Sequence, residues 1–306
     1  MTRTAPASGN LRGYLAVLGA ATLWGISGVV AKTLFNRRIE PWTVVEIRLT
    51  GAFLVLLLVL WLRRHPLRVA REHLVPLGVL GVVMLSTQFL YYFTISVTDV
   101  STAIFLQYTA PAFVALYGRL AEREALSGLK SGAIAVAVAG SYLLVTGGGG
   151  MRVRPLGLAT GFASAVMFGV YAVLGRSRVH RVGSVTALLY ALGAASLVWS
   201  VIVPPWKAFA GHAPQEWALF GYIVVFATIM PFWLFLTGLR TITSSMASLT
   251  ATFEPVVASA AAFAILGERL SPLQALGGAA IAAAVVLIQV ADIRTEARGI
   301  LPPAPD

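Results

Sequence analysis

The sequence contains one pattern twice, at an offset of 144 residues. Residues 103–127 and 247–271 are each mostly apolar, carry a proline in their first half and end in Glu-x-Leu-Ser, so that Pro111 is matched with Pro255. The same offset holds outside these stretches, where it pairs Gly13 with Gly157 and Gly25 with Gly169. A register that survives over most of a chain indicates an internal duplication. We therefore expect two copies of one structural unit.

Apolar runs of roughly 20 residues follow one another along both copies, which is the length a helix needs to cross about 30 Å of hydrocarbon. Hydrophobic residues make up 58% of the 306 residues and charged residues only 11%. A single aqueous core could not bury that much apolar surface. The chain is therefore predicted to be a helical membrane protein.

Ten such runs are expected to be membrane spans, five in each half. They are residues 13–34, 43–62, 74–96, 100–120, 128–146, 155–175, 184–203, 217–239, 244–266 and 272–290. An odd number of spans per half turns the second copy upside down relative to the first. The predicted fold is an all-α polytopic membrane protein with ten transmembrane helices arranged as two inverted five-helix repeats.

The predicted domain boundaries follow from these spans. They are an N-terminal tail at 1–12, a first repeat at 13–146, a linker at 147–154, a second repeat at 155–290 and a C-terminal tail at 291–306. The linker begins with four glycines, which make it flexible. Pro155, which follows it, can open the next helix.

The Lys and Arg residues predict the orientation. With the N-terminus inside, fifteen of them fall in cytoplasmic loops and tails and seven on the outer side, although the basic first outer loop runs against the rule. Both termini are therefore expected in the cytoplasm. Because the basic residues are scattered over short loops, the net charge of +11 does not indicate a nucleic-acid surface. Four tryptophans near span ends are expected to anchor at the headgroups: Trp42, Trp61, Trp206 and Trp217.

The residue types needed for catalysis within a membrane are missing from the spans. The chain has no Cys, and its four His residues lie in predicted loops or at span edges. The glycine run at 147–150 lacks the Lys and Ser or Thr of a phosphate-binding loop. We therefore expect no enzyme, no metal site and no cofactor.

Aromatic residues lie midway along several predicted spans. At the repeat offset Trp24 is matched with Phe168, and Phe89 with Trp233, while Tyr171 follows one turn after Phe168. If these helices converge, their rings form walls of a pocket between the halves, where transporter sites tend to lie. Alternatively the rings fill space between helices or face lipid.

Glu254 is the most informative polar residue, since a carboxylate near the bilayer centre costs on the order of 3 kcal/mol. Thr250 lies four residues earlier on the same expected helix face, and Gln107 is the polar residue on the matching face of the fourth span. Glu254 is predicted to bind a substrate ammonium or to carry a proton. Alternatively it is a protonated or hydrogen-bonded carboxyl without a role in transport.

Other polar residues allow two interpretations. Gln88, Tyr91 and Tyr92 share one face of the third span, where they can bind a ligand or join helices. Glu46 and Arg48 point to different sides of the second span, close enough to its outer end that we expect them to snorkel rather than to function.

Three prolines interrupt predicted spans, and each removes a helix hydrogen bond: Pro111, Pro231 and Pro255. Pro111 and Pro255 are matched by the repeat, which predicts a bend in the fourth and ninth spans. Such bends are hinges or fixed kinks.

The residues at the end of the second repeat resemble a known family. Trp24-Gly25 in the first span and Pro255 followed by Gly267-Glu268-Arg269-Leu270-Ser271, Gln274 and Gly277 are similar to the EamA family of the drug/metabolite transporter superfamily. The first copy of the motif is looser. The resemblance implies a bacterial inner-membrane carrier, often an exporter of amino acids or other metabolites, that works without ATP. Within the family the chain is similar to YddG-type exporters of aromatic amino acids.

The resulting hypothesis is a secondary transporter that exports small metabolites, amino acids including aromatic or apolar ones, by alternating access. Its predicted substrate-binding residues are Trp24, Gln88, Tyr91, Gln107, Tyr108, Phe168, Tyr171, Trp233, Thr250 and Glu254. The alternatives are an exporter of cationic drugs and a membrane scaffold or sensor that transports nothing. The expected partners are the small-molecule substrate and the lipid bilayer. Since one chain holds both halves, it is compatible with a monomer.

Overall fold

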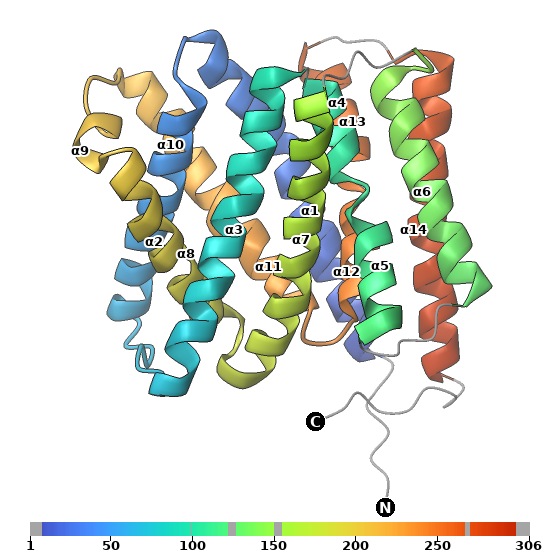
Figure 1. Cartoon of the computed structure of the whole chain (residues 1–306), viewed down its shortest axis with the longest axis horizontal. Coiled ribbons are helices and arrows are strands. Elements are labelled where there is room, and N and C mark those ends of the chain that lie inside the picture. Colours follow the sequence, from blue (N-terminus) through green and yellow to red (C-terminus); the bar gives the residue numbers. More distant parts are fainter. Residues whose placement is uncertain (1–7, 99, 122–126, 150–154, 267–269, 298–306) are drawn as a thin grey trace, which may run out of the picture.

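In the computed structural model, residues 8–98, 100–121, 127–149, 155–266 and 270–297 are described, and within them every regular element is a helix (Figure 1). The first half contains α1 (Ser8–Asn36), α2 (Pro41–Leu62), α3 (Arg71–Val97), α4 (Val100–Gln107), α5 (Ala110–Ala121) and α6 (Gly128–Thr146). The second half contains α7 (Pro155–Val182), α8 (Ser184–Ile202), the short α9 (Pro205–Ala208), α10 (Pro214–Val224), the π-helix η1 (Val225–Ile229), α11 (Met230–Gly238), α12 (Ser244–Ala251), α13 (Glu254–Leu266) and α14 (Pro272–Ala297).

Seven helices of the described part of the chain are long and apolar enough to cross a membrane. They correspond to α2, α3, α6, α7, α8, α14 and the continuous segment from α10 through η1 to α11. The helix α1, with 29 residues, is not among them, and the predicted fourth and ninth spans are each divided into two short helices. The all-helical fold is thus confirmed. Of the ten predicted spans, seven correspond to single helices of the described residues that are long and apolar enough to cross a membrane.

The two divided helices break at matched positions. Between α4 and α5 the break takes up residues 108–109, and between α12 and α13 it takes up 252–253, again 144 residues further on. Pro111 and Pro255 are each the second residue after the break. Because proline has no N–H to donate to the residue four positions earlier, the helix cannot continue through this point. Shorter i to i+3 bonds, such as Phe253 N–H to the Thr250 carbonyl at 3.1 Å, bridge the gap.

Pro231 is accommodated differently, because the chain stays helical around it. It is the second residue of α11 and follows the π-helix η1. The wider turn of a π-helix absorbs the irregularity that the proline imposes. The carbonyl four residues earlier, that of Ala227, loses the partner that an N–H at position 231 would supply.

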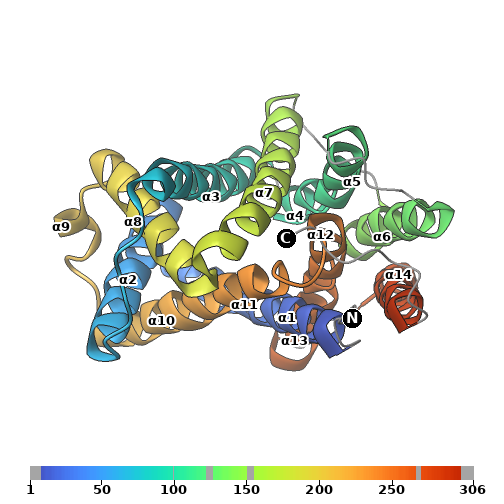
Figure 2. The same cartoon turned by 90° about the horizontal axis from the view of Figure 1, so that it is seen from below.

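The two halves interlock rather than lying side by side. The first-half helix α1 packs on α11 and α13, and its repeat mate α7 packs on the mates of those helices, α3 and α5. Two pairs of mates also pack on each other, α2 with α8 and α6 with α14. Figure 2 shows these pairs at opposite ends of the elongated bundle. These contacts repeat when the halves are exchanged, which is the arrangement a duplicated unit produces.

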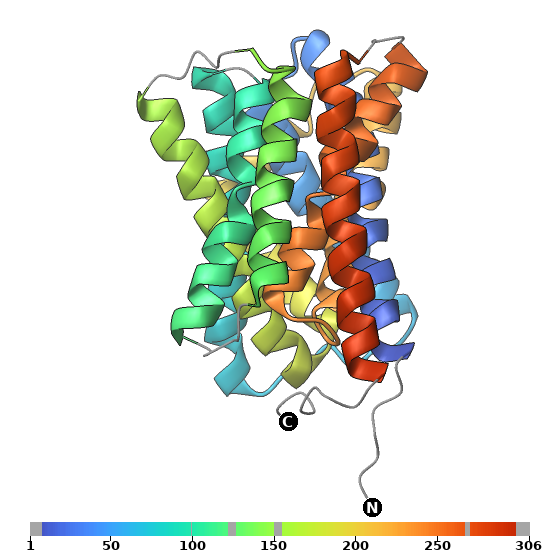
Figure 3. The ribbon, with the colours of Figure 1, turned by 90° about the vertical axis from the view of Figure 1, so that its right-hand side faces the viewer.

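Small residues allow the closest of these helix contacts. A Cβ added at Gly140 of α6 would lie 2.8 Å from the carbonyl oxygen of Gly277 of α14, and one added at Gly277 would meet the backbone of Leu144 and Gly140. Figure 3 shows α6 and α14 running next to each other over their length. Only glycine at both positions permits this approach of the two backbones.

Several helices extend beyond the predicted spans. The helix α1 already begins at Ser8 and α14 runs to Ala297, so parts of the predicted tails at 1–12 and 291–306 are helical. A helix bonds its own backbone and can therefore continue past the hydrocarbon into water. The hydroxyl of Tyr14, near the start of α1, donates to Asp292 Oδ2, near the end of α14, at 2.7 Å. Both helix ends consequently lie on the same side of the bundle (Figure 3).

The α6–α14 contact gives a stability prediction. We expect Gly277→Ala to lower the free energy of unfolding by about 2 kcal/mol, because the new methyl group would overlap the backbone of α6. Gly132→Ala is the control, because a Cβ at Gly132 of α6 meets nothing within 4 Å. Thermal unfolding of both variants in detergent measures the effect. Equal melting temperatures would contradict the tight contact.

Candidate functional site

Arg48 of α2 is a charged residue in the interior of the bundle. Only 7% of its surface is exposed. Its Nε donates to Thr228 Oγ1 at 3.2 Å, Nη2 donates to the Ala227 carbonyl at 3.0 Å, and Nη1 lies 3.4 Å from the Tyr92 hydroxyl. With the Gln88 amide oxygen turned toward the guanidinium, that oxygen accepts from Nη1 and Nη2 at 2.8 and 3.0 Å. The expectation that Arg48 snorkels to the membrane surface is therefore wrong.

The backbone irregularity at Pro231 explains how Arg48 is held. Pro231 has no N–H to donate to the Ala227 carbonyl. This carbonyl accepts a hydrogen bond from Arg48 instead. Sequence reasoning missed Arg48 as a site residue because it counted the distance to the end of α2 and not the partners that α3 and η1 provide. The available signal was a charge within a predicted span.

Glu46, two residues before Arg48, is fully buried on a different side of α2. Its Oε1 accepts from the Thr50 hydroxyl at 2.6 Å and from Ser200 Oγ of α8 at 3.0 Å. The prediction that the two residues point apart is confirmed, but snorkelling is wrong for Glu46 too. Its hydrogen bond with Ser200 makes it a structural link between α2 and α8.

Glu254 lies at the break between α12 and α13 and is half-buried. The Tyr108 hydroxyl, from the matching break between α4 and α5, is hydrogen-bonded to the Glu254 carboxyl. Glu254 also interacts electrostatically with Arg48 and Tyr91. As the first residue of α13, a negatively charged Glu254 would be stabilised by the positive end of the helix dipole.

These residues form one group, which we call the polar cluster: Arg48, Gln88, Tyr91, Tyr92, Tyr108, Thr228 and Glu254. They come from α2, α3, η1, the break before α5, and α13. Gln88, Tyr91, Tyr108 and Glu254 were predicted from the sequence, whereas Arg48, Tyr92 and Thr228 were not predicted as binding residues. The cluster places one guanidinium and one carboxyl, both ringed by hydroxyl and amide groups, in an apolar bundle.

A second group, the aromatic cluster, contains Trp24, Phe168, Tyr171, Phe232 and Phe235 from α1, α7 and α11. The Trp24 ring lies 5.1 Å from Phe232, 5.8 Å from Phe235 and 6.4 Å from Phe168, between ring centroids. Trp24 and Phe168 are half-buried, but Tyr171 is fully buried and its hydroxyl finds no partner among the described residues. Sequence reasoning missed Phe232 and Phe235.

Trp233 and its mate Phe89 do not join this cluster. Trp233 is 39% exposed and Phe89 is 36% exposed. Neighbouring helix residues point about 100° apart, so an inward Phe232 turns Trp233 outward. Phe89 packs instead against Trp42 and Trp199 at 5.8 and 5.7 Å. The exposure of Trp233 agrees with the alternative that this ring faces lipid, and Trp42, at the start of α2, packs on core rings.

Gln107 and Thr250 are tied to other helices. Ser164 Oγ of α7 donates to Gln107 Oε1 at 3.0 Å, and Gln289 Nε2 of α14 donates to Thr250 Oγ1 at 3.5 Å. The expected common face of Thr250 and Glu254 does not apply, because the helix is interrupted between them. Residues four apart share a face only along a continuous helix.

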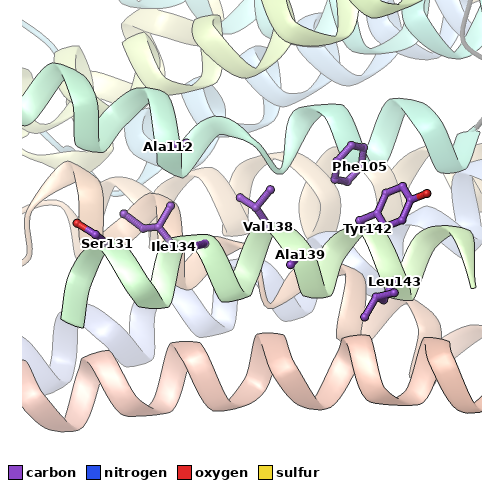
Figure 4. Close-up of a pocket in the computed structure, with 9 residues that line it drawn as sticks. Phe105, Ala112, Ser131, Ile134, Val138, Ala139, Tyr142 and Leu143 are labelled. Carbon is purple, nitrogen blue, oxygen red and sulfur yellow. The ribbon is translucent and has the colours of Figure 1, made fainter. Parts of the chain in front are cut away.

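An apolar groove of about 720 Å³ lies between α6 and the pair α4 and α5. In Figure 4, Ile134 and Val138 of α6 point toward the chain that carries Ala112 and Phe105. The rings of Phe105 and Tyr142 meet at 5.5 Å. No charged residue appears among the described side chains that line it, so it suits hydrocarbon better than a charged metabolite.

No group of three or more His, Asp or Glu side chains that could hold a metal ion occurs within the described ranges. The motif residues 267–269 lie outside those ranges, so the structure does not describe that part of the family motif.

Comparison with known proteins matches both halves of the chain to one family. The profile of the EamA-like transporter family matches residues 11–146 and again residues 155–290. A solved crystal structure shares the fold with a TM-score of 0.77, at 20% identity, over 95% of this chain and 100% of that chain.

Two curated relatives cover most of the sequence. The uncharacterized inner membrane transporter YicL of Salmonella typhimurium is 28% identical over 94% of this chain and 98% of its own length. The threonine/homoserine exporter RhtA of Escherichia coli is 27% identical over 83% of each chain. The narrower YddG-type similarity stays a prediction.

The burial of Arg48 gives a prediction about stability. We expect Arg48→Gln to destabilise the protein by about 3 kcal/mol, because it leaves the Ala227 carbonyl and Thr228 without their charged donor. Arg63→Gln is the matched control, since Arg63 is exposed at the end of the same helix, and a change within about 0.5 kcal/mol is expected. Thermal unfolding in detergent measures both. Equal stability of the two variants would show that Arg48 is not held as described.

Proposed function

Because the chain belongs to the EamA-like transporter family, we propose that it is a secondary transporter whose cargo is amino acids, aromatic or apolar ones included. Its membership makes it a membrane transporter, and its named relatives are transporters rather than enzymes. The observation that carries the choice of cargo is the polar cluster. It offers a positive and a negative group to one small molecule.

The charges of the polar cluster are complementary to a zwitterion. The Arg48 guanidinium is fixed by η1 and α3 and attracts a carboxylate, while the half-buried Glu254 can accept a hydrogen bond from an ammonium group. Such interactions are stronger in the bundle than in water, because the effective dielectric constant is lower. Tyr108, which is hydrogen-bonded to Glu254, and Tyr91, which interacts with it electrostatically, supply hydroxyl groups that orient the ligand.

The repeat supports an apolar portion of the cargo. At the offset of 144 residues, Gln88 and Tyr91 of the polar cluster are matched with Phe232 and Phe235 of the aromatic cluster. Corresponding positions of the two halves therefore present hydrogen-bonding groups on one side and rings on the other. In this proposal the polar cluster binds the charged end of an amino acid, and Trp24 and Phe168 contact its side chain.

Two alternatives fit less well. Export of a cationic drug would use Glu254 and the rings, but the buried Arg48, with no carboxylate in ion-pairing distance among the described residues, would repel a cation. A scaffold or sensor without transport would not need charged groups at depth, which are costly in a membrane. The name of RhtA, a threonine/homoserine exporter, supports the amino-acid class for a relative.

We further propose ten crossings, with both termini in the cytoplasm of a bacterial cell. The seven helices that qualify alone, together with α1, the pair α4–α5 and the pair α12–α13, make this number. The hydrogen bond between Tyr14 and Asp292 supports an even number, because it brings the two ends of the chain to one side. The excess of basic residues at that side supports the orientation.

In the proposed transport cycle the interlocked halves rock about the two matched breaks, so that the polar cluster is reached from alternate sides. Pro111 and Pro255 act as hinges, because the helix lacks a hydrogen bond next to each of them. Pro231 has a different role, since its missing N–H leaves a carbonyl for Arg48. One chain suffices for this cycle.

Counterflow tests the function. Proteoliposomes loaded with a mixture of amino acids should accumulate labelled phenylalanine, leucine or threonine without ATP. We expect Glu254→Gln to reduce this exchange at least tenfold, because a charge-assisted hydrogen bond contributes about 1.5–3 kcal/mol. Glu72→Gln on the exposed end of α3 should exchange like the wild type.

Two outcomes would contradict the proposed cargo, and a third would contradict the proposed role of Glu254. Absence of exchange of every amino acid by folded protein would exclude this cargo. Exchange of a labelled lipophilic cation in place of amino acids would favour the drug exporter. Unchanged exchange in Glu254→Gln would remove Glu254 from the site while leaving the function intact.

A further inference from the structure

A pocket with polar lining residues is formed where α3 begins and α7 ends. Figure 1 shows these two helix ends on the same side of the bundle. It has a volume of about 630 Å³. Its charged or titratable lining residues are His65, Arg68, His73, Arg181 and Arg240, and none of the described residues that line it is acidic. The exposed Glu72 lies 3.7 Å from His73 Nε2 but does not line the pocket. We call this site the basic pocket.

The N-terminus of α8 forms one wall of the basic pocket. Gly183, with a φ of 81°, is the N-cap and offers no side chain to the first N–H groups of the helix. Ser184 lines the pocket and is only 6% exposed, yet its hydroxyl oxygen has no hydrogen-bond partner among the described residues. An uncapped helix start and an unsatisfied hydroxyl both favour a ligand with anionic oxygens.

The other walls of the basic pocket are a loop that is hydrogen-bonded to α8 and the end of the membrane helix α11. The Tyr190 hydroxyl of α8 donates to the Leu67 carbonyl at 2.7 Å, which holds the loop that carries His65 and Arg68 over the helix. The opposite wall consists of Trp233, Thr237 and Arg240. Trp233 is 39% exposed, and a tryptophan next to basic residues at a helix end is typical of the boundary between headgroups and acyl chains.

We propose that the basic pocket binds the phosphate of an anionic phospholipid. Arg181 and Arg240 pair with the phosphate, Ser184 and the start of α8 donate hydrogen bonds to it, and the acyl chains run along α11 past Trp233. A lipid suits the site better than free phosphate, because one wall is a membrane-spanning helix with an exposed indole. Basic pockets between helices at the cytoplasmic side are a recurrent form of lipid site.

Native mass spectrometry of delipidated protein in detergent tests the proposal. Phosphatidylglycerol should bind more tightly than phosphatidylcholine. We expect the double variant Arg181→Gln and Arg240→Gln to bind phosphatidylglycerol on the order of 30-fold more weakly, since each arginine near a membrane surface contributes about a fivefold factor. Ser184→Ala, which keeps every charge, should weaken binding about threefold.

The control removes the same charge elsewhere. Arg12 and Arg63 are exposed and do not line the pocket, so Arg12→Gln with Arg63→Gln should bind phosphatidylglycerol like the wild type. Equal weakening in both double variants, or no weakening in either, would overturn the proposal. Displacement of phosphatidylglycerol by millimolar inorganic phosphate would overturn the lipid as the ligand. The lipid measurement is independent of whether amino acids are transported.

Discussion

Hydrocarbon offers no hydrogen-bond partner, so a charged group that this chain carries into the bundle depends on other parts of the protein for its hydrogen bonds. Arg48 shows the consequence most fully. Its guanidinium donates hydrogen bonds to the Ala227 carbonyl, to which Pro231 cannot donate, and to the Thr228 hydroxyl. It also lies close to the Tyr92 hydroxyl of α3. A carbonyl left without its helix hydrogen bond in one helix thereby accepts a hydrogen bond from a charged side chain on another helix. On the other side of α2, Glu46 Oε1 accepts a hydrogen bond from Ser200 of α8, whereas its Oε2 has no partner among the described residues.

Duplication explains where the helix breaks and several of the helix contacts lie. The breaks at 108–109 and 252–253 are repeat mates, and the packing of α1 on α11 and α13 has its counterpart in that of α7 on α3 and α5. The side chains, however, have diverged. Arg48 of the first repeat is matched with Leu192, and Glu254 of the second repeat is matched with Ala110. Each charge of the polar cluster therefore has an uncharged residue at the matching position of the other repeat. A scaffold with repeated helix contacts thus carries an asymmetric polar cluster, which suits the proposed amino-acid cargo.

The sequence allowed the helices to be predicted better than the contacts of their side chains. Apolar length located α6 at residues 128–146, as observed, and the paired prolines indicated the two breaks. Burial depends on neighbours that only the fold supplies. Trp42, expected near the headgroups from its place at a span end, also packs on Trp199, and of the neighbouring rings Phe232 meets Trp24 while Trp233 is 39% exposed. Arg48 was misjudged because its acceptors lie 179 and 180 residues away in the chain.

In the proposed transport cycle the polar cluster is reached from both sides of the membrane in turn. Because the chain contains no Cys, a single cysteine at position 91 provides an unambiguous probe. A membrane-impermeant thiol reagent is applied to Tyr91→Cys in right-side-out and in inside-out vesicles, with and without an amino acid that the protein exchanges. Alternating access predicts labelling from each side, slowed in both cases by that amino acid. Labelling from one side only, unaffected by any amino acid, would contradict the account.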